Sequence, residues 1–303
     1  MVRVVQRPRR WSLSLAVAVL AFLPFSGGQA QTVSFDFNTS GQLSTSFNFS
    51  HNGVAIGSIP YLQSPTGGLF QSGSVTVLAP SSDTAADVTA VLRTRSFDFS
   101  KPGAQLTISE FVQAIGISGG GGRLLQLGFV SSSTASLNNV PGTAFMSLRL
   151  GTVGSSGTTY TPQFQDKTGL GNAVATGLVP NLTLTQGDWY QLTGTFSNIG
   201  GGKFQASGML QDFGPTGDSA AGWIFPFPLQ TFTNDDMTAD EAVWPAFRSF
   251  RNDGAGALDN LVVRAVPEPS MGLLWLLGAA ALVLAKGIVH CQSASFRGCA
   301  QRP

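Results

Sequence analysis

The densest group of acidic side chains lies between residues 235 and 241. It contains Asp235, Asp236 and Asp240, with Asn234 and Glu241 on either side. Carboxylate and amide oxygens are the ligands that Ca²⁺ prefers in proteins, so the three aspartates are the candidate metal ligands. Their spacing does not follow a regular calcium-binding loop. The alternative interpretation is a set of solvated loop charges.

Two tryptophans near this acidic group, Trp223 and Trp244, are the candidate ligand-binding residues. The flat apolar face of a sugar ring fits the face of an aromatic ring, and a tryptophan also offers one polar N–H. The alternative is that these rings hold a long loop against the core. The sequence leaves both interpretations open.

Catalytic patterns are missing from the body of the chain, defined here as residues 31–265. Glycosidases place two carboxylates on either side of the scissile bond, but neither Glu110 nor Glu241 sits in a Glu-x-Asp-x-x-Glu arrangement. His51 is the only histidine of the body, which excludes a zinc site built from several histidines and leaves few options for a catalytic triad. We therefore predict no enzymatic activity, with an unfamiliar carboxylate pair as the alternative.

Composition favours strands and turns over helices. The chain has 303 residues, of which 37 are glycine, 22 are phenylalanine and only 11% are charged. Phenylalanine is enriched in strands and glycine in turns. The body holds about 10 Lys and Arg against about 15 Asp and Glu. Its formal charge is therefore about −5. Nucleic acid and anionic membrane surfaces are therefore not expected as partners.

Polar and apolar residues alternate along many short segments, which places one face of each in a core and the other in water. The segments are 32–37, 44–49, 74–77, 106–108, 125–127, 145–150, 182–184, 190–196, 204–206 and 258–263. Glycine-rich turn signals separate them, among them residues 119–122, which we interpret as a hairpin turn. The pattern predicts an all-β, antiparallel β-sandwich or barrel in one domain, residues 31–265. Residues 215–245 are expected to form a long excursion between strands.

The two ends of the chain have the composition of targeting segments. Residues 1–30 combine arginines, an apolar stretch and small residues before a cut after Ala30, which is typical of a secretory signal peptide. Residues 266–303 contain Val266, Pro267, Glu268, Pro269 and Ser270, then an apolar run at 271–285 and Lys286. Both cysteines, Cys291 and Cys299, follow that run, so the body cannot contain a disulfide.

This C-terminal pattern resembles the PEP-CTERM sorting signal of Gram-negative bacteria. The resemblance rests on Val266, Pro267, Glu268, Pro269 and Ser270 followed directly by the apolar run. It implies a membrane-bound intermediate, recognition and cleavage by an exosortase, and delivery to the cell surface or extracellular matrix. The family usually has a cluster of Arg or Lys after the apolar run, whereas this chain has only Lys286 there.

The body is similar, over shorter motifs, to concanavalin A-like and laminin G-like jelly rolls. The motifs are residues 189–196, which resemble a central strand, and residues 258–263, which resemble a last strand with Asp259 and Asn260 at its entry. The resemblance implies a jelly-roll sandwich and a role in binding carbohydrate. We therefore expect an exported, non-enzymatic surface or matrix protein that binds exopolysaccharide in a biofilm. The alternatives are a glycan-cleaving enzyme of the lectin/glucanase type and a purely structural matrix protein.

Overall fold

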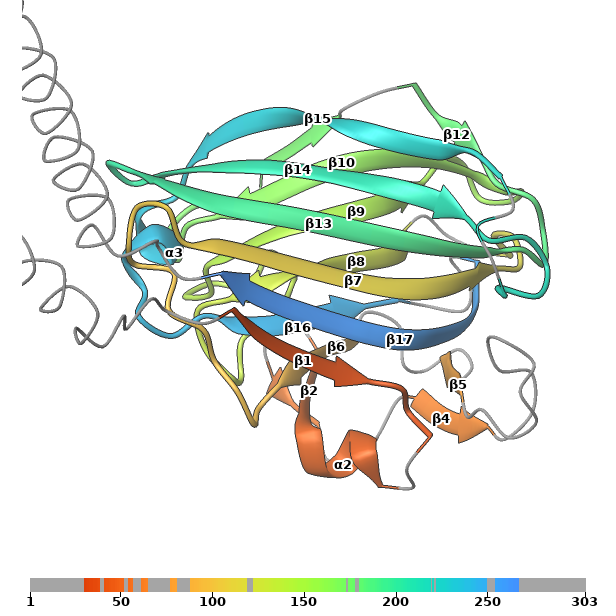
Figure 1. Ribbon diagram of the computed structural model, residues 1–303, viewed down its shortest axis with the longest axis horizontal. Coiled ribbons are helices and arrows are strands. Elements are labelled where there is room, and N and C mark those ends of the chain that lie inside the picture. The colour runs from red at the N-terminus through yellow and green to blue at the C-terminus, as the bar shows by residue number, and fades with distance from the viewer. Residues whose placement is uncertain are drawn as a thin grey trace, which may run out of the picture. The chain divides into compact units, whose positions relative to one another are not determined.

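The computed structural model is shown in Figure 1. The described residues are 30–38, 41–51, 54–56, 61–64, 77–80, 88–118, 122–172, 174–177, 180–218, 220, 222–249 and 254–266. All of them belong to a unit that spans Gln29–Glu268. The expected signal peptide before Ala30, the sorting residues Pro267 to Ser270 and the apolar run lie outside the described residues. The boundaries of those segments therefore stay predictions.

The described strands form two antiparallel sheets, and sheet A lies in front of sheet B in Figure 1. From one edge to the other, sheet A consists of β15 (Ile224–Thr233), β14 (Lys203–Asp212), β13 (Trp189–Gly200), β7 (Gln105–Ala114), β17 (Ala255–Val266), β5 (Val77–Pro80) and β4 (Tyr61–Ser64), and β1 (Gln31–Phe35) also pairs with β17. The prediction of an all-β antiparallel fold with two layers is confirmed.

Sheet B is the second layer. Its order is β11 (Val174–Gly177), β10 (Thr159–Lys167), β9 (Phe145–Thr152), β8 (Arg123–Val130), β16 (Trp244–Arg248), β6 (Val88–Leu92), β2 (Phe47–His51) and β3 (Val54–Ala55), and β12 (Leu182–Thr183) pairs with β10. Two helices of five residues each accompany the described strands, α2 (Gln42–Ser46) and α3 (Asp235–Ala239). None of the helices in this part of the chain has the length and apolar character needed to cross a membrane.

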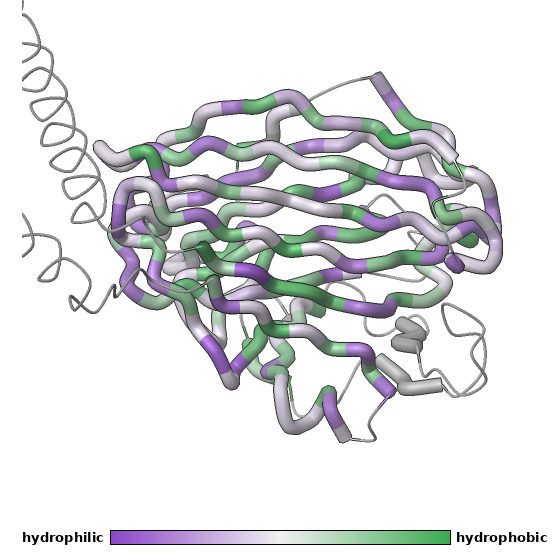
Figure 2. The backbone as a smooth tube through the Cα atoms, viewed as in Figure 1, coloured by the Kyte–Doolittle hydropathy of each residue, from purple (hydrophilic) through white to green (hydrophobic). Residues whose placement is uncertain are grey.

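Alternating burial explains why these segments form strands. Along β13, Tyr190, Leu192 and Phe196 are buried, whereas Gln191 and the threonines between them are half-exposed. Figure 2 shows the same alternation of hydropathy along the long strands. Each sheet thus presents an apolar inner face, and burial of both faces against each other stabilises the sandwich.

The core joins the inner faces of the two sheets. Phe129 of β8 meets Phe196 of β13 edge to face, with ring centroids 5.8 Å apart, a favourable aromatic geometry. Gly208 of β14 lies so close to β9 that a β-carbon there would stand 2.6 Å from Cδ2 of Leu148. The same β-carbon would lie 2.6 Å from the carbonyl oxygen of Thr193, so a side chain at position 208 does not fit without a shift of the backbone.

Two connections differ from the sequence-based expectations. Residues 215–245 contain the ten-residue strand β15 and the helix α3 instead of one long excursion. Pro226 and Pro228 hide the alternation of β15 in the sequence, but a strand at the edge of a sheet tolerates proline. The strands on either side of residues 119–122 do not form the predicted hairpin, since β7 belongs to sheet A and β8 to sheet B; residues 119–121 themselves lie outside the described residues.

Two local expectations are also wrong. The first part of the predicted strand 44–49 belongs to α2, whose last carbonyl groups accept hydrogen bonds from Arg93. Asp259 and Asn260 lie in the middle of β17 and not at its entry. Asn260 has a φ of 50°, and the register with β7 shifts between Asp259 and Val262. These features identify a β-bulge.

Candidate functional sites

The helix α3 is held in place by a buried asparagine. The Asn234 side chain accepts a hydrogen bond from the Met237 backbone N–H at 3.2 Å and thereby caps the helix. Its amide nitrogen donates to the carbonyl oxygens of Phe145 and Lys167, at 3.2 and 3.0 Å. One side chain therefore fixes α3 against β9 and β10.

The three predicted acidic residues meet at a cavity beside α3, which we call the α3 cavity. Its volume is 600 Å³, and ligand pockets in proteins typically measure about 300 to 1,000 Å³. The lining residues are Ser131, Gly142, Ala144, Gly169, Leu170, Asp235, Asp236, Ala239 and Asp240. The segments that meet there are far apart in the sequence, so the fold and not local sequence creates the cavity.

The aspartates of the α3 cavity have different surroundings. Asp235 approaches the turn after β13 so closely that a β-carbon on Gly202, which has a φ of +71°, would overlap its carboxylate. Asp236 accepts a hydrogen bond from the Gly169 N–H. Burial, and then the charge of Asp236, raise the pKa of Asp240 to about 6. Asp240 thus keeps its proton to a higher pH than an ordinary aspartate does.

Calcium binding by Asp235, Asp236 and Asp240 stays a prediction. Within the described part of the chain, no three Asp, Glu, His or Cys side chains converge closely enough to hold a metal ion. The aspartates share a cavity, but their carboxylates point to different neighbours.

Trp223 lies at the other end of the edge strand, just before β15, and is 40% exposed. Its ring centroid is 6.0 Å from that of Tyr190 and 6.2 Å from that of Phe225. Phe225 in turn contacts the buried Phe227 at 6.1 Å. A row of aromatic rings therefore runs from the core to the surface, and it supports a partly exposed indole at its outer end.

Two carboxylates, those of Asp188 and Asp212, lie near Tyr190, whose ring contacts Trp223. Asp212 pairs with Tyr190 across β13 and β14, and its backbone N–H donates to the Trp223 carbonyl oxygen at 3.2 Å. Burial and the charge of Asp212 raise the pKa of Asp188. We call Trp223, Tyr190, Asp188 and Asp212 the Trp223 site. Neither aspartate was singled out from the sequence, because they are far apart along the chain.

Gly222 leaves room for the side chain of Asp212. A β-carbon at position 222 would lie 2.6 Å from Oδ2 of Asp212, and Oδ1 of Asp212 accepts a hydrogen bond from the Gly214 N–H at 2.8 Å. The carboxylate of Asp212 is therefore held in one orientation next to Gly222, the residue that precedes Trp223.

Trp244 has a different environment. It is half-buried and packs on the outer face of sheet B against a small cluster that includes Ala135, Leu137 and Ala246. Its ring thus takes part in packing a loop onto the sheet.

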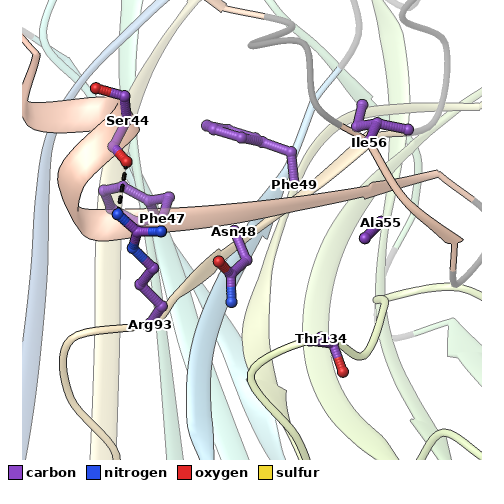
Figure 3. A pocket seen from close by; sticks show the side chains of 8 residues that line it. All are labelled: Ser44, Phe47, Asn48, Phe49, Ala55, Ile56, Arg93 and Thr134. Carbon is purple, nitrogen blue, oxygen red and sulfur yellow. Dashed lines mark hydrogen bonds between the residues drawn. The ribbon is translucent and has the colours of Figure 1, made fainter.

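A further cavity lies at the sheet edge beside β2 and β3 (Figure 3). Its volume is 300 Å³, and Phe47, Phe49 and Ile56 give it an apolar lining. Arg93 reaches into it, but its guanidinium donates to the carbonyl oxygens of Ser44 and Thr45 at 2.8 and 3.0 Å. Arg93 therefore completes the end of α2.

A carboxylate is buried on the inner face of sheet A. Glu110 of β7 follows Leu106 and Ile108 on the inner face, is fully buried, and neither of its oxygens has a hydrogen-bond partner. Burial, and then the charge of Asp259, raise the pKa of Glu110 well above 4.5. Its place in the alternation of β7 was readable in the sequence. The approach of Asp259 was not, because it depends on the bulge in β17.

The comparisons with known proteins give no family. No protein-family model matches the chain, and no curated protein matches it. Among solved structures, an endo-1,3-beta-glucanase from Streptomyces sioyaensis is 13% identical with a TM-score of 0.41, and the match covers 80% of this chain and 98% of that one. Lectin I-B4 from Griffonia simplicifolia is 12% identical with a TM-score of 0.40, covering 77% of this chain and 98% of that one.

Tailspike protein 2 from Escherichia coli O157:H7 bacteriophage CAB120 is also similar. It is 14% identical with a TM-score of 0.39, and the match covers 72% of this chain and 25% of the tailspike, so this chain spans about a quarter of it. At these identities and TM-scores the likenesses carry no argument, and the two-sheet fold rests on the strand pairing described above.

Proposed function

We propose that this protein is an exported, non-enzymatic β-sandwich of the cell surface or extracellular matrix that binds polysaccharide at the Trp223 site. Export and exosortase sorting are supported by the two targeting segments of the sequence, and the jelly-roll topology by the motifs at 189–196 and 258–263. The observation that carries the binding proposal is the partly exposed Trp223 ring, supported from below by aromatic rings and accompanied by Asp212 and Asp188.

The chemistry of the Trp223 site suits a sugar ring. The indole offers an apolar face for the C–H side of the ring, and burial of that face drives binding. Carboxylates accept hydrogen bonds from sugar hydroxyl groups, and such charge-assisted bonds are stronger than neutral ones. Because Asp212 is held by the Gly214 N–H, the site is organised before the ligand arrives, which lowers the cost of binding.

A polysaccharide panel tests this function. Recombinant residues 31–266, which lie within the compact unit Gln29–Glu268, are tested against neutral and acidic polysaccharides by glycan array and affinity electrophoresis. The expected result is retention by at least one polysaccharide and weaker retention of Trp223→Ala. Absence of binding across the panel would reject the function and favour a purely structural matrix protein.

Glycan cleavage is the second candidate, favoured by one observation in the α3 cavity. Asp240 has a pKa raised to about 6 next to Asp236, and a glycosidase needs one protonated and one ionised carboxyl group. The test is the release of reducing ends from the same panel by the wild type and by Asp240→Asn. Release by the wild type alone would overturn the non-enzymatic proposal.

A further inference from the structure

The outer face of sheet B carries a polar strip on β8, β9 and β10. Met146, Leu148 and Leu150 of β9 belong to the core, so Ser147, Arg149 and Gly151 face away from it. The register places Gln126 of β8 and Gln163 of β10 on either side of Arg149. The strip therefore consists of amides, a hydroxyl and an arginine, with no aromatic ring among these residues.

The loop between β8 and β9, residues 131–144, covers the neighbouring part of this face. Asn48 donates to the Ser133 carbonyl oxygen at 2.9 Å, and Arg248 donates to that of Leu137 at 2.9 Å. These contacts fix the loop over β2 and β16. Arg149 lies on β9, on the other side of β8 from β16, and it is only half-buried. Solvent can therefore reach it.

The guanidinium of Arg149 is held from one side. Its Nε donates to Oε1 of Gln163 at 2.6 Å, and Nε lies 3.7 Å from where a β-carbon of Gly151 would stand. The guanidinium thus rests above a glycine, where no side chain occupies the sheet surface. Within the described residues, neither Nη nitrogen has a hydrogen-bond or ion-pair partner.

A second cation approaches Arg149. Arg123 at the start of β8 is in register with Gly151, the residue beneath the Arg149 guanidinium. Burial, and then the charge of Arg123, lower the pKa of Arg149. The positive charge of Arg123 adds to that of Arg149, and no carboxylate of the described residues pairs with Arg149 although the body is acidic overall. The arrangement is that of a site for an anionic group.

We propose that Arg149, with the positive charge of Arg123 beside it, forms an anion-binding site on the outer face of sheet B, and that this site takes the carboxylate groups of an acidic polysaccharide. The proposal rests on the proposed function and names the class of polymer. A guanidinium fork matches the planar geometry of a carboxylate. Gln163 orients the fork, and Thr161, in register with Gly151 on β10, adds a hydroxyl for neighbouring sugar hydroxyl groups.

The experiment compares a uronic acid polymer with its uncharged form. Residues 31–266 are titrated with polygalacturonate, with fully methyl-esterified polygalacturonate and with dextran sulfate, at low and at physiological salt. The expected result is binding of polygalacturonate that weakens with salt, with much weaker binding of the ester. Arg149→Gln should weaken binding of polygalacturonate about tenfold or more.

The control variant is Arg264→Gln, which removes the same charge at an exposed position of β17 on sheet A. It should bind like the wild type, and thermal melts check that both variants are folded. Equal binding by Arg149→Gln and the wild type, or equal binding of the ester, would overturn the site. Tighter binding of dextran sulfate would overturn the assignment to carboxylate.

The binding experiments distinguish a wrong anion site from a wrong function. If only neutral polysaccharides bind and Trp223→Ala abolishes that binding, the anion site is wrong and the proposed function stands. If no polysaccharide binds at all, both are rejected.

Discussion

At the scale of single residues, the most unusual feature is a glutamate inside the core. Glu110 occupies an inward position of β7 where the neighbouring positions are apolar, and both of its oxygens lack hydrogen-bond partners. An ionised carboxylate at such a place is costly, so the group keeps its proton to a higher pH. A buried acid with no exposed surface cannot touch a substrate. We therefore expect Glu110 to affect the stability of the fold.

The first prediction follows from the raised pKa of Glu110. Between pH 4.5, its usual pKa, and its raised pKa in the folded protein, the folded state binds more protons than the unfolded state. The free energy of unfolding should therefore fall as pH rises through this window. Chemical denaturation at a series of pH values measures it.

Glu110→Gln removes the titrating group while nearly keeping its shape. The variant should lose this part of the pH dependence and be more stable than the wild type at the upper end of the window. Glu241→Gln, at an exposed position, serves as the control and should keep the pH dependence of the wild type. An unchanged slope in Glu110→Gln would show that the glutamate is not the group that titrates.

At the scale of elements, α3 depends on the residue that precedes it. A five-residue helix gains little stability of its own, so its position must come from contacts such as those of Asn234. We predict that Asn234→Ala lowers the free energy of unfolding by about 2 kcal/mol, because a cap is lost and two buried carbonyl groups lose their donor.

Denaturant titration of Asn234→Ala and of a control, Thr231→Ala, measures this effect. Thr231 is exposed on the edge strand β15, so its truncation should change stability by less than about 0.5 kcal/mol. A similar small change in both variants would mean that other contacts hold α3 and the α3 cavity.

The sequence predicted which segments form strands better than it predicted how those strands pair. Alternation located β7, β8, β9, β13 and β17, because a strand with one buried face must alternate. It missed β15, where prolines occupy the outward positions, and the bulge at Asn260, where pairing with β7 decides the backbone. The acidic group at 235–240 and Trp223 were visible in the sequence. Asp188, Asp212, Arg123 and Arg149 were not, since strand register brings them to their neighbours.

At the scale of the whole molecule, the first and last strands of the body are partners. Gln31 of β1 pairs with Ala265 of β17, and Val266 pairs with Gln105 of β7. The predicted cut after Ala30 thus lies immediately before a strand, and the first residue of the predicted sorting motif is the last residue of another. Both predicted processing points adjoin the same end of sheet A.

Mass spectrometry of the protein isolated from cells tests the predicted processing. We expect an N-terminus at Gln31 and a C-terminus that lacks residues 271–285, since signal peptidase and exosortase would remove the two apolar segments. A C-terminus that still contains residues 271–285 would contradict sorting by cleavage. Deletion of the segment from 266 onward is the control and should abolish display at the cell surface.

The most direct test of the binding proposal compares one residue at the Trp223 site with one tryptophan elsewhere. Affinity electrophoresis of residues 31–266 on the polysaccharide that the wild type retains best is repeated with Trp223→Ala and with Trp244→Phe. We predict that Trp223→Ala loses about tenfold or more in affinity while its melting temperature is nearly unchanged, and that Trp244→Phe binds like the wild type. Equal retention of Trp223→Ala and the wild type would contradict binding at this site.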